Sequence, residues 1–229
     1  MTSPGPVPYG TPDAPRIAVR GEAHLEVDPE IARIGITVTA RGRDRRTALD
    51  DLTRRNATVL DLVKSYGDAV ERVETGALSL TPQLTKGRGE RVRTYQGTVH
   101  LTAELTDFTA LGELTTRLAD LDLTRVDGPW WSLRPDSPAH RDARRRAVQE
   151  AVQRAREYAE ALGTTLAALV ELADTGAEAP HPYAPAPGSM RSVAYAAEDA
   201  GAAPLDLEPQ RQQVYATVNA RFTMNPPAL

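Results

Sequence analysis

The chain has 229 residues, of which 41% are hydrophobic, 25% are charged and only 5% are aromatic. This composition is typical of a globular protein of one or two domains whose core is built from Leu, Val, Ile and Ala. The net charge of −4 disfavours a general binder of nucleic acid or anionic membranes, and the absence of cysteine excludes disulfides, thiolate catalysis and thiolate metal sites.

Two segments lack the patterns of helices and strands. Residues 1–16 are rich in Pro and Gly, which predicts a disordered N-terminal tail, and residues 225–229 are expected to form a C-terminal tail. The Pro- and Ala-rich residues 176–209 predict a long flexible loop inside one domain that spans 17–224. The N-terminal residues lack the basic start and following apolar run of a signal peptide, so none is visible. No stretch approaches the roughly 20 apolar residues of a membrane span. We therefore expect a cytoplasmic protein.

The chain after the tail begins with two strands and a helix. Apolar and polar residues alternate over 17–27 and again over 33–41, which predicts two half-buried strands. Asp28-Pro29-Glu30 lies between them as a turn, so the strands are expected to pair as a hairpin. The helix is expected over 47–66, closed by Gly67. Its apolar stripe contains Leu49, Leu52, Val59, Leu60 and Val63.

Asn56 falls on that stripe, where a buried amide bonded to the backbone is favoured over a ligand-binding group. The third strand is expected over 73–80 and is ended by Pro82. The flexible stretch 86–89 predicts a hairpin tip. The fourth strand, over 94–105, has the clearest two-residue alternation in the chain and places Tyr95 on its apolar face.

Asp107 is expected to cap a second helix that turns Leu111, Leu114 and Leu118 inward. A short strand over 126–133 follows. It contains Trp130 and Trp131, which must point to opposite faces, so at most one ring belongs to the core. The other ring could stack on bases or sugars, but an interface is favoured.

The strongest pattern in the chain is a helix over 137–162 with alanine at every fourth position. Ser137 is its expected cap, Pro138 its first residue and Gly163 its end. The alanine face allows very close packing and carries no nucleophile, acid or metal ligand. The alanines of this face are Ala143, Ala147, Ala151, Ala155 and Ala159.

Two further strands, over 166–172 and 214–222, complete the order β-β-α-β-β-α-β-α-β-loop-β. Hairpins mixed with helices predict an α+β fold, with mixed, largely antiparallel sheets packed by three helices.

Candidate chemical groups are sparse. The four histidines have no partner at the spacing of a metal site, and each is interpreted as a surface residue. They are His24, His100, His140 and His181. Three basic clusters are interpreted as solvated surface because acidic residues lie among them. The clusters are Arg41, Arg43, Arg45 and Arg46; Lys86, Arg88, Arg91 and Arg93; and Arg144, Arg145 and Arg146.

Taken together, the patterns over about residues 16–224 resemble the SIMPL domain family, a domain of unknown function in bacterial periplasmic and outer-membrane-associated proteins. The resemblance implies an α+β fold, ring-like oligomers in some relatives and stress tolerance in others, and it brings no catalytic residues. The chain departs from bacterial members in lacking a visible signal peptide. The matching positions are Val19-x-Gly21, Val27 to Ala32, Asn56, Val73-x-Thr75, Leu78 to Pro82, Tyr95, the alanine helix with Gly163, and the strand 214–222.

These observations predict a non-enzymatic, self-associating scaffold or binding module, with a role in stress as an implication of the resemblance. No catalytic, cofactor or metal site, no nucleic-acid partner and no membrane span are predicted. The alternatives are an enzyme with dispersed carboxylates, such as a hydrolase, and a weak nucleic-acid binder that uses the arginine clusters. Candidate interface residues are Trp130, Trp131, Tyr95 and Tyr215.

Overall fold

The computed structural model describes residues 10–84, 92–174 and 205–228. The predicted hairpin tip at 86–89, His181, and most of the tail 1–16 and of the loop 176–209 lie outside these residues. The predicted α+β class and element order are confirmed. The chain divides into two compact units: unit 1 comprises residues 1–27, 135–193 and 213–229, and unit 2 comprises residues 28–134 and 194–212.

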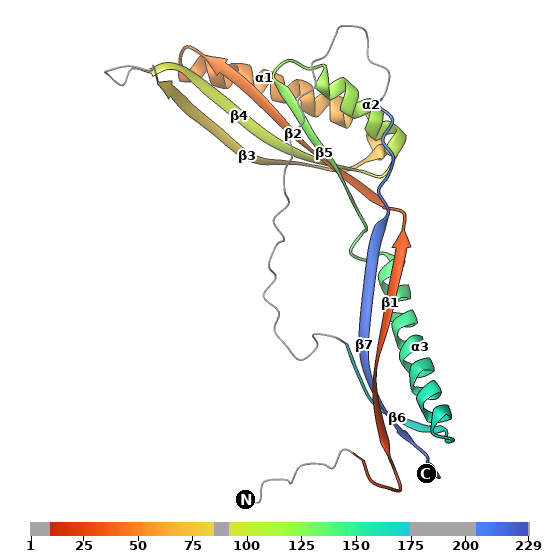
Figure 1. Ribbon diagram of the computed structural model, residues 1–229. Coiled ribbons are helices and arrows are strands. Elements are labelled where there is room, and N and C mark those ends of the chain that lie inside the picture. The colour runs from red at the N-terminus through yellow and green to blue at the C-terminus, as the bar shows by residue number, and fades with distance from the viewer. Residues whose placement is uncertain (1–9, 85–91, 175–204, 229) are drawn as a thin grey trace, which may run out of the picture. The chain divides into compact units, whose positions relative to one another are not determined.

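Unit 2 is a four-stranded antiparallel sheet with two helices on the same face (Figure 1). The strand order is β3-β4-β2-β5, so β2 lies between β4 and β5. Its elements are β2 (Ile31–Gly42), α1 (Arg45–Lys64), a short 3-10 turn (Gly67–Ala69), β3 (Val70–Leu84), β4 (Val92–Leu105), α2 (Phe108–Ala119) and β5 (Thr124–Ser132).

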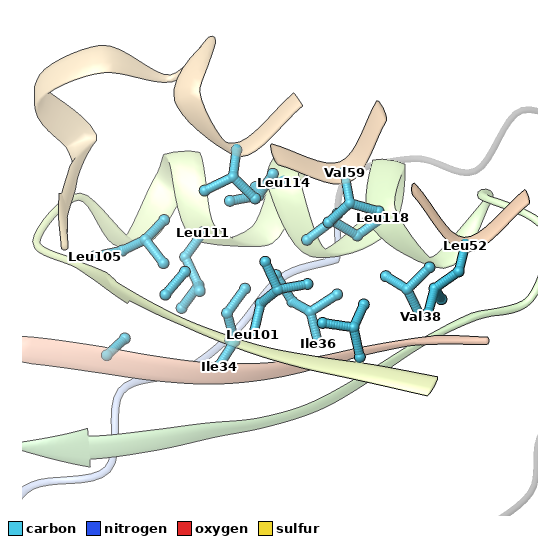
Figure 2. Close-up of a cluster of buried hydrophobic side chains, with 14 of the residues drawn as sticks. Ile34, Ile36, Val38, Leu52, Val59, Leu101, Leu105, Leu111, Leu114 and Leu118 are labelled. Atoms are coloured by element: carbon cyan, nitrogen blue, oxygen red, sulfur yellow. The ribbon is translucent and has the colours of Figure 1, made fainter. Parts of the chain in front are cut away.

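The core of unit 2 forms where the two helices meet the inner face of this sheet. In Figure 2, Ile34, Ile36 and Leu101 of the strands point toward leucine and valine side chains of α1 and α2. The alternation of β2 and β4 explains this face, because every second residue is apolar and fully buried. The helix residues are Leu52 and Val59 from α1 and Leu111, Leu114 and Leu118 from α2.

Both helices of unit 2 begin at an aspartate. Asp44 accepts the backbone N–H of Thr47, and Asp107 accepts the backbone N–H groups of Thr109 and Ala110. Each carboxylate thereby satisfies donors that the first helical turn leaves without partners. The expected cap at Asp107 is confirmed.

Three details of α1 differ from expectation. Its C-cap is Ser65, and Gly67 lies at a φ of +52° in the turn that follows. Leu49 is 42% exposed, because Ala48 takes the buried position beside β2. The side-chain oxygen of Asn56 is buried without a hydrogen-bond partner and is not bonded to the backbone as expected.

Two expectations about the strands are wrong. The strands before and after Asp28-Pro29-Glu30 do not form a hairpin, because β2 pairs with β4 and β5 while the first strand joins a different sheet. The third strand continues through Pro82 to Leu84. It can do so because β3 is an edge strand, where a residue without an N–H can face away from the neighbouring strand.

Unit 1 is a three-stranded sheet, in the order β1-β7-β6, with one helix packed against it (Figure 1). The five alanines of α3 are buried, as predicted, and Ala147, Ala151 and Ala155 form a core cluster with Val19, Val218 and Phe222 of the sheet. The elements are β1 (Arg16–Val27), α3 (Pro138–Ala161), β6 (Leu166–Asp174) and β7 (Gln212–Met224).

The contact between α3 and β1 is close because it joins alanines to a glycine. A Cβ atom on Gly21 would lie 2.1 Å from the carbonyl oxygen of Ala147 and 2.6 Å from the amide nitrogen of Ala151. Only a residue without a side chain fits there. Gly163 terminates the helix, as predicted: it follows the C-cap Leu162 with a φ of +67°, and the N–H of Thr164 donates to the carbonyl of Ala159.

Candidate functional site

The described residues contain no group of three or more His, Asp or Glu side chains that could hold a metal ion. Perturbed pKa values among them have structural causes. The backbone N–H of Thr47 lowers the pKa of Asp44, and the guanidinium of Arg55 lowers the pKa of Asp51. Burial raises the pKa of the Tyr66 hydroxyl. Asp44 caps α1, Asp51 pairs with an arginine of the same helix, and Tyr66 lies just after it. These are structural roles, so the groups do not mark a catalytic centre.

The three described histidines lie on separate elements. His24 on β1 and His100 on β4 are exposed, and His140 is half-buried near the start of α3. The Nδ1 atom of His100 is 3.0 Å from the Oγ1 atom of Thr37. The structure therefore does not bring the described histidines together with carboxylates into a constellation for metal binding or nucleophilic catalysis.

The described arginines of the basic clusters make local contacts. The guanidinium of Arg45 lies over the ring of Tyr95, 5.4 Å from its centroid. Arg145 pairs with Asp142 one turn earlier on α3, at 3.4 Å. Lys86, Arg88 and Arg91 lie outside the described residues.

The interface candidates lie on both units, and those of unit 2 do not form one surface. Tyr215 belongs to unit 1, is 66% exposed and stacks in parallel on His24 at 4.6 Å. Tyr95 pairs with Gly42 at one end of β2, and Trp130 pairs with Arg33 near the other end. Their use as an interface stays a prediction.

The two adjacent tryptophans point to opposite faces of β5, as alternation requires. Trp131 packs on the core of unit 2 and meets the ring of Phe108 edge to face at 4.8 Å. Trp130 is 49% exposed on the outer face of the sheet, opposite the helices.

On the outer face of the unit 2 sheet, Trp130 belongs to a group of three rows, each made of residues that lie opposite one another on neighbouring strands. Register places side chains of β5, β2 and β4 next to one another on this face. We call these nine residues the Trp130 platform. The rows are Trp130, Arg33 and Glu104; Asp127, Gly35 and Thr102; and Arg125, Thr37 and His100.

Both cations of the platform are paired with its carboxylates. Arg33 donates to Glu104 through Nε at 3.0 Å and Nη2 at 2.6 Å. Arg125 donates to Asp127 through Nε at 2.9 Å and Nη2 at 2.6 Å. Sequence reasoning missed the platform, because the rows depend on β2 lying between β4 and β5.

A second feature of interest is the apolar edge strand of unit 1. Leu169, Val170 and Leu172 of β6 are 55%, 42% and 47% exposed. Beside them, an open groove of about 390 Å³ runs between β6 and the C-terminal half of α3. We call the three side chains and this groove the β6 surface. The groove is lined in part by Val152, Ala159, Leu166 and Phe222.

The two edges of the unit 1 sheet differ in their protection. On β1, the backbone N–H of Glu22 donates to the side chain of Glu150 on α3 at 3.0 Å. This bond gives a backbone donor of the edge strand β1 a partner on α3, and such coverage discourages the addition of another strand. On β6, two bulges interrupt the pairing with β7, but the described side chains of this strand include no Pro, Lys or Arg.

Comparison with known proteins identifies the family. The model of the SIMPL family, described as a protein of unknown function (DUF541), matches residues 17–222. The chain therefore belongs to the SIMPL family, and the resemblance seen in the sequence is confirmed.

Two curated relatives are similar over most of their length. The 26 kDa periplasmic immunogenic proteins of Brucella melitensis biotype 1 and of Brucella abortus strain S19 are each 26% identical to this chain over 192 residues. Each alignment covers 80% of this chain and 76% of the relative. The expectation of a cytoplasmic location is contradicted, because both relatives are named as periplasmic proteins.

A solved structure from Burkholderia cenocepacia, described as a "putative amidohydrolase/peptidase", shares 17% identity with this chain and has a TM-score of 0.28. The match covers 58% of this chain and spans about a third (33%) of that protein. At this level of likeness it has no implication for fold or activity. Among the described residues, no helix has the length and apolarity that a membrane span requires.

Proposed function

We propose that this chain is a non-catalytic protein of the bacterial periplasm that associates with copies of itself through the β6 surface. The periplasmic location follows the names of the Brucella relatives. The observation that carries the association is the exposure of three large apolar side chains, Leu169, Val170 and Leu172, on one edge strand.

Burial of these side chains supplies the driving force. Complete burial of a Leu or Val side chain contributes roughly 1.5–3 kcal/mol. Since the three are each about half exposed, covering them contributes roughly 3 kcal/mol, and filling the adjoining groove adds to this. Large exposed apolar surface typically marks an interaction site.

A second copy of the chain suits this edge. In an antiparallel pair of β6 strands centred on Val170, Glu171 lies opposite Leu169 and Asp174 lies opposite Leu166. In this register no like charges face each other. Like charges directly opposite each other would have destabilised the pair. Glu171 is also already paired with Arg221 of β7 at 2.6 Å. The sheet would continue across the two copies.

The small core of unit 1 supports the same conclusion. One helix covers this three-stranded sheet, and it does so with alanine methyl groups. Small domains gain little from such a core and are commonly stabilised by association. The inward face of α3 also offers no group for chemistry, which favours a structural role for the unit.

The test is the molar mass of the full chain in solution. Size-exclusion chromatography with light scattering at tens of micromolar should give a multiple of the 24.8 kDa chain mass. The variant Leu169→Lys should give a monomer, because it places a charge at the centre of the β6 surface. A matched control is Leu78→Lys, which alters an exposed leucine of the edge strand β3 in unit 2.

We expect Leu78→Lys to associate like the unaltered chain. A monomeric unaltered chain would refute self-association. Equal association of the unaltered chain and Leu169→Lys would instead refute the assignment to the β6 surface.

A further inference from the structure

We infer that the Trp130 platform of unit 2 is a binding site for uncharged oligosaccharides. The platform lies on unit 2, whereas the proposed self-association uses unit 1, so the two proposals stand on different residues. The inference rests on the placement of the ring, on the balance of charge around it and on the polar groups at its edge.

The ring of Trp130 lies against the backbone of two glycines, where there is no side chain between the ring and the main chain. Its Cη2 and Cζ3 atoms lie 3.4 Å from the position that a Cβ of Gly35 would take, and its Cε3 atom lies 3.3 Å from the corresponding position at Gly128. Two glycines thus support the indole from the sheet side, while 49% of the residue is open to solvent. A supported, half-exposed aromatic ring is a ready stacking surface.

A sugar ring matches such a surface. One face of a pyranose presents mainly C–H groups, which are weakly positive, and the face of an aromatic ring is negative. Stacking therefore combines apolar contact with favourable electrostatics. The hydroxyl groups around the sugar point outward, toward whatever polar groups surround the aromatic ring.

The surroundings of Trp130 supply those groups. Arg33 and Arg125 offer N–H donors in a planar fork, and Glu104 and Asp127 offer carboxylate acceptors. The side chains of Asp127 and Arg125 are 34% and 66% exposed, so hydroxyl groups can reach them. The ion pairs hold these groups in position before a ligand arrives.

Charge balance selects an uncharged ligand. The two arginines of the platform are matched by two carboxylates, and the neighbouring Arg72 and Glu74 of β3 pair with each other at 2.5 Å. A face with no net charge lacks the excess of cations that nucleic-acid backbones require. It favours a neutral ligand rich in hydroxyl groups.

A protein partner fits this face less well. Stable protein interfaces place several apolar or aromatic anchors at a dry centre. Within the three rows of the platform, Trp130 is the one large apolar side chain among charged and hydroxyl-bearing neighbours.

The test uses the two tryptophans of the chain. In the full-length variant Trp131→Phe, Trp130 is the sole tryptophan and reports directly on the platform. We expect its fluorescence to change in a saturable way on titration with at least one of cellotetraose, chitotetraose and maltotetraose. Isothermal titration calorimetry on the unaltered chain should give the same affinity, which covers the case in which Trp131→Phe folds poorly.

The matched variants separate the platform from other surfaces. Trp130→Ala should weaken binding by about tenfold or more, since stacked rings commonly contribute this much. Asp127→Asn should weaken binding by a smaller factor. Tyr215→Ala, which removes an exposed ring of unit 1, should leave the affinity unchanged. The molar mass of Trp130→Ala in solution, measured by light scattering, should equal that of the unaltered chain, because the platform shares no residue with the β6 surface.

Three results would overturn the inference. The first is no saturable response to any of the three tetrasaccharides up to about 10 mM, a concentration at which even weak affinities are measurable. The second is saccharide binding that persists unchanged in Trp130→Ala. The third is Trp130-dependent binding of an oligothymidylate with no binding of the saccharides, which would assign the ring to nucleic-acid bases.

Discussion

The substitution Gly21→Ala tests whether the close approach of α3 to β1 holds unit 1 together. The new methyl carbon would lie 2.1 Å from the carbonyl oxygen of Ala147, whereas ordinary contacts begin at 3.4 Å. The helix must therefore move outward by the difference, about 1.3 Å. The nearest atoms are backbone atoms and a methyl group of the helix, so no flexible side chain can turn aside.

The expected loss of stability follows from two opposing effects. Overpacking a tight contact costs about 1–3 kcal/mol, and here the clash is with backbone, which favours the upper part of that range. Replacing glycine by alanine lowers the entropy of the unfolded chain and restores about 0.4–1 kcal/mol. We expect a net loss of about 2 kcal/mol for unit 1.

Hydrogen exchange measured by mass spectrometry resolves this loss within the chain. Amides of α3 should exchange about 30-fold faster in Gly21→Ala, the factor that corresponds to about 2 kcal/mol when exchange follows local opening. Both tryptophans lie on β5 in unit 2, so their fluorescence reports on the other unit during the same experiment.

Gly76→Ala is the matched control, because a Cβ there would meet a single neighbouring atom, the carbonyl oxygen of His100, at the ordinary distance of 3.6 Å. It should change stability by no more than about 0.5 kcal/mol. Protection of α3 in Gly21→Ala that stays within about threefold of the unaltered chain would refute the reasoning, because it corresponds to well under 1 kcal/mol.

Two further predictions concern α3 and α1. Ala151→Leu should destabilise the chain by about 1–3 kcal/mol in urea denaturation through overpacking, whereas Arg145→Leu on the exposed side of α3 should change stability by less than about 0.5 kcal/mol. A near-zero effect of Ala151→Leu would contradict the close packing. Because the cap bond lowers the pKa of Asp44, its stabilisation is complete above the ordinary pKa of 3.8 and is lost as the pH falls through the lower folded value. Asp44→Asn should therefore reduce the fall in melting temperature over that acid range. If the melting temperature of the variant fell with pH as steeply as that of the unaltered chain, the loss would belong to other carboxylates.

Local patterns predicted the elements of this fold well. The alanine spacing of α3, the caps at Asp107 and Ser137, and the alternation of β4 all correspond to observed structure. Each of these signals depends on residues within about one or two helical turns of one another, where the periods of helix and strand decide which side chains share a face. The burial of the five alanines follows directly from their spacing.

Strand pairing could not be predicted in the same way. A short turn at Asp28-Pro29-Glu30 favours a hairpin between the strands around it, yet β1 pairs with β7, whose residues lie far along the chain. The half-buried pattern of β1 suits any sheet with one covered face. The close contact between Gly21 of β1 and the alanines of α3 also joins residues far apart in sequence, and no local pattern contains it.

The candidate sites show the same division. Opposite faces for Trp130 and Trp131 follow from alternation alone, but only the structure shows that Trp130 is the exposed ring. The grouping of Trp130 with Asp127 and Thr102 depends on register across three strands, including a shift between β2 and β5. Asn56 shows the limit for single residues, because its position on a buried stripe did not reveal that its oxygen lacks a partner.

The division of the chain between its units affects the order in which it can fold. All the helices and strands of unit 2 lie between residues 28 and 134, so they are complete before most of unit 1 has been made. Unit 1 joins β1, near the start of the chain, to β7, near its end. During synthesis, β1 must therefore wait for its partner while unit 2 is already able to form. Contacts between residues so distant in sequence are slow to close, which makes unit 1 the last part of the protein to mature and the part most dependent on an intact C-terminal strand.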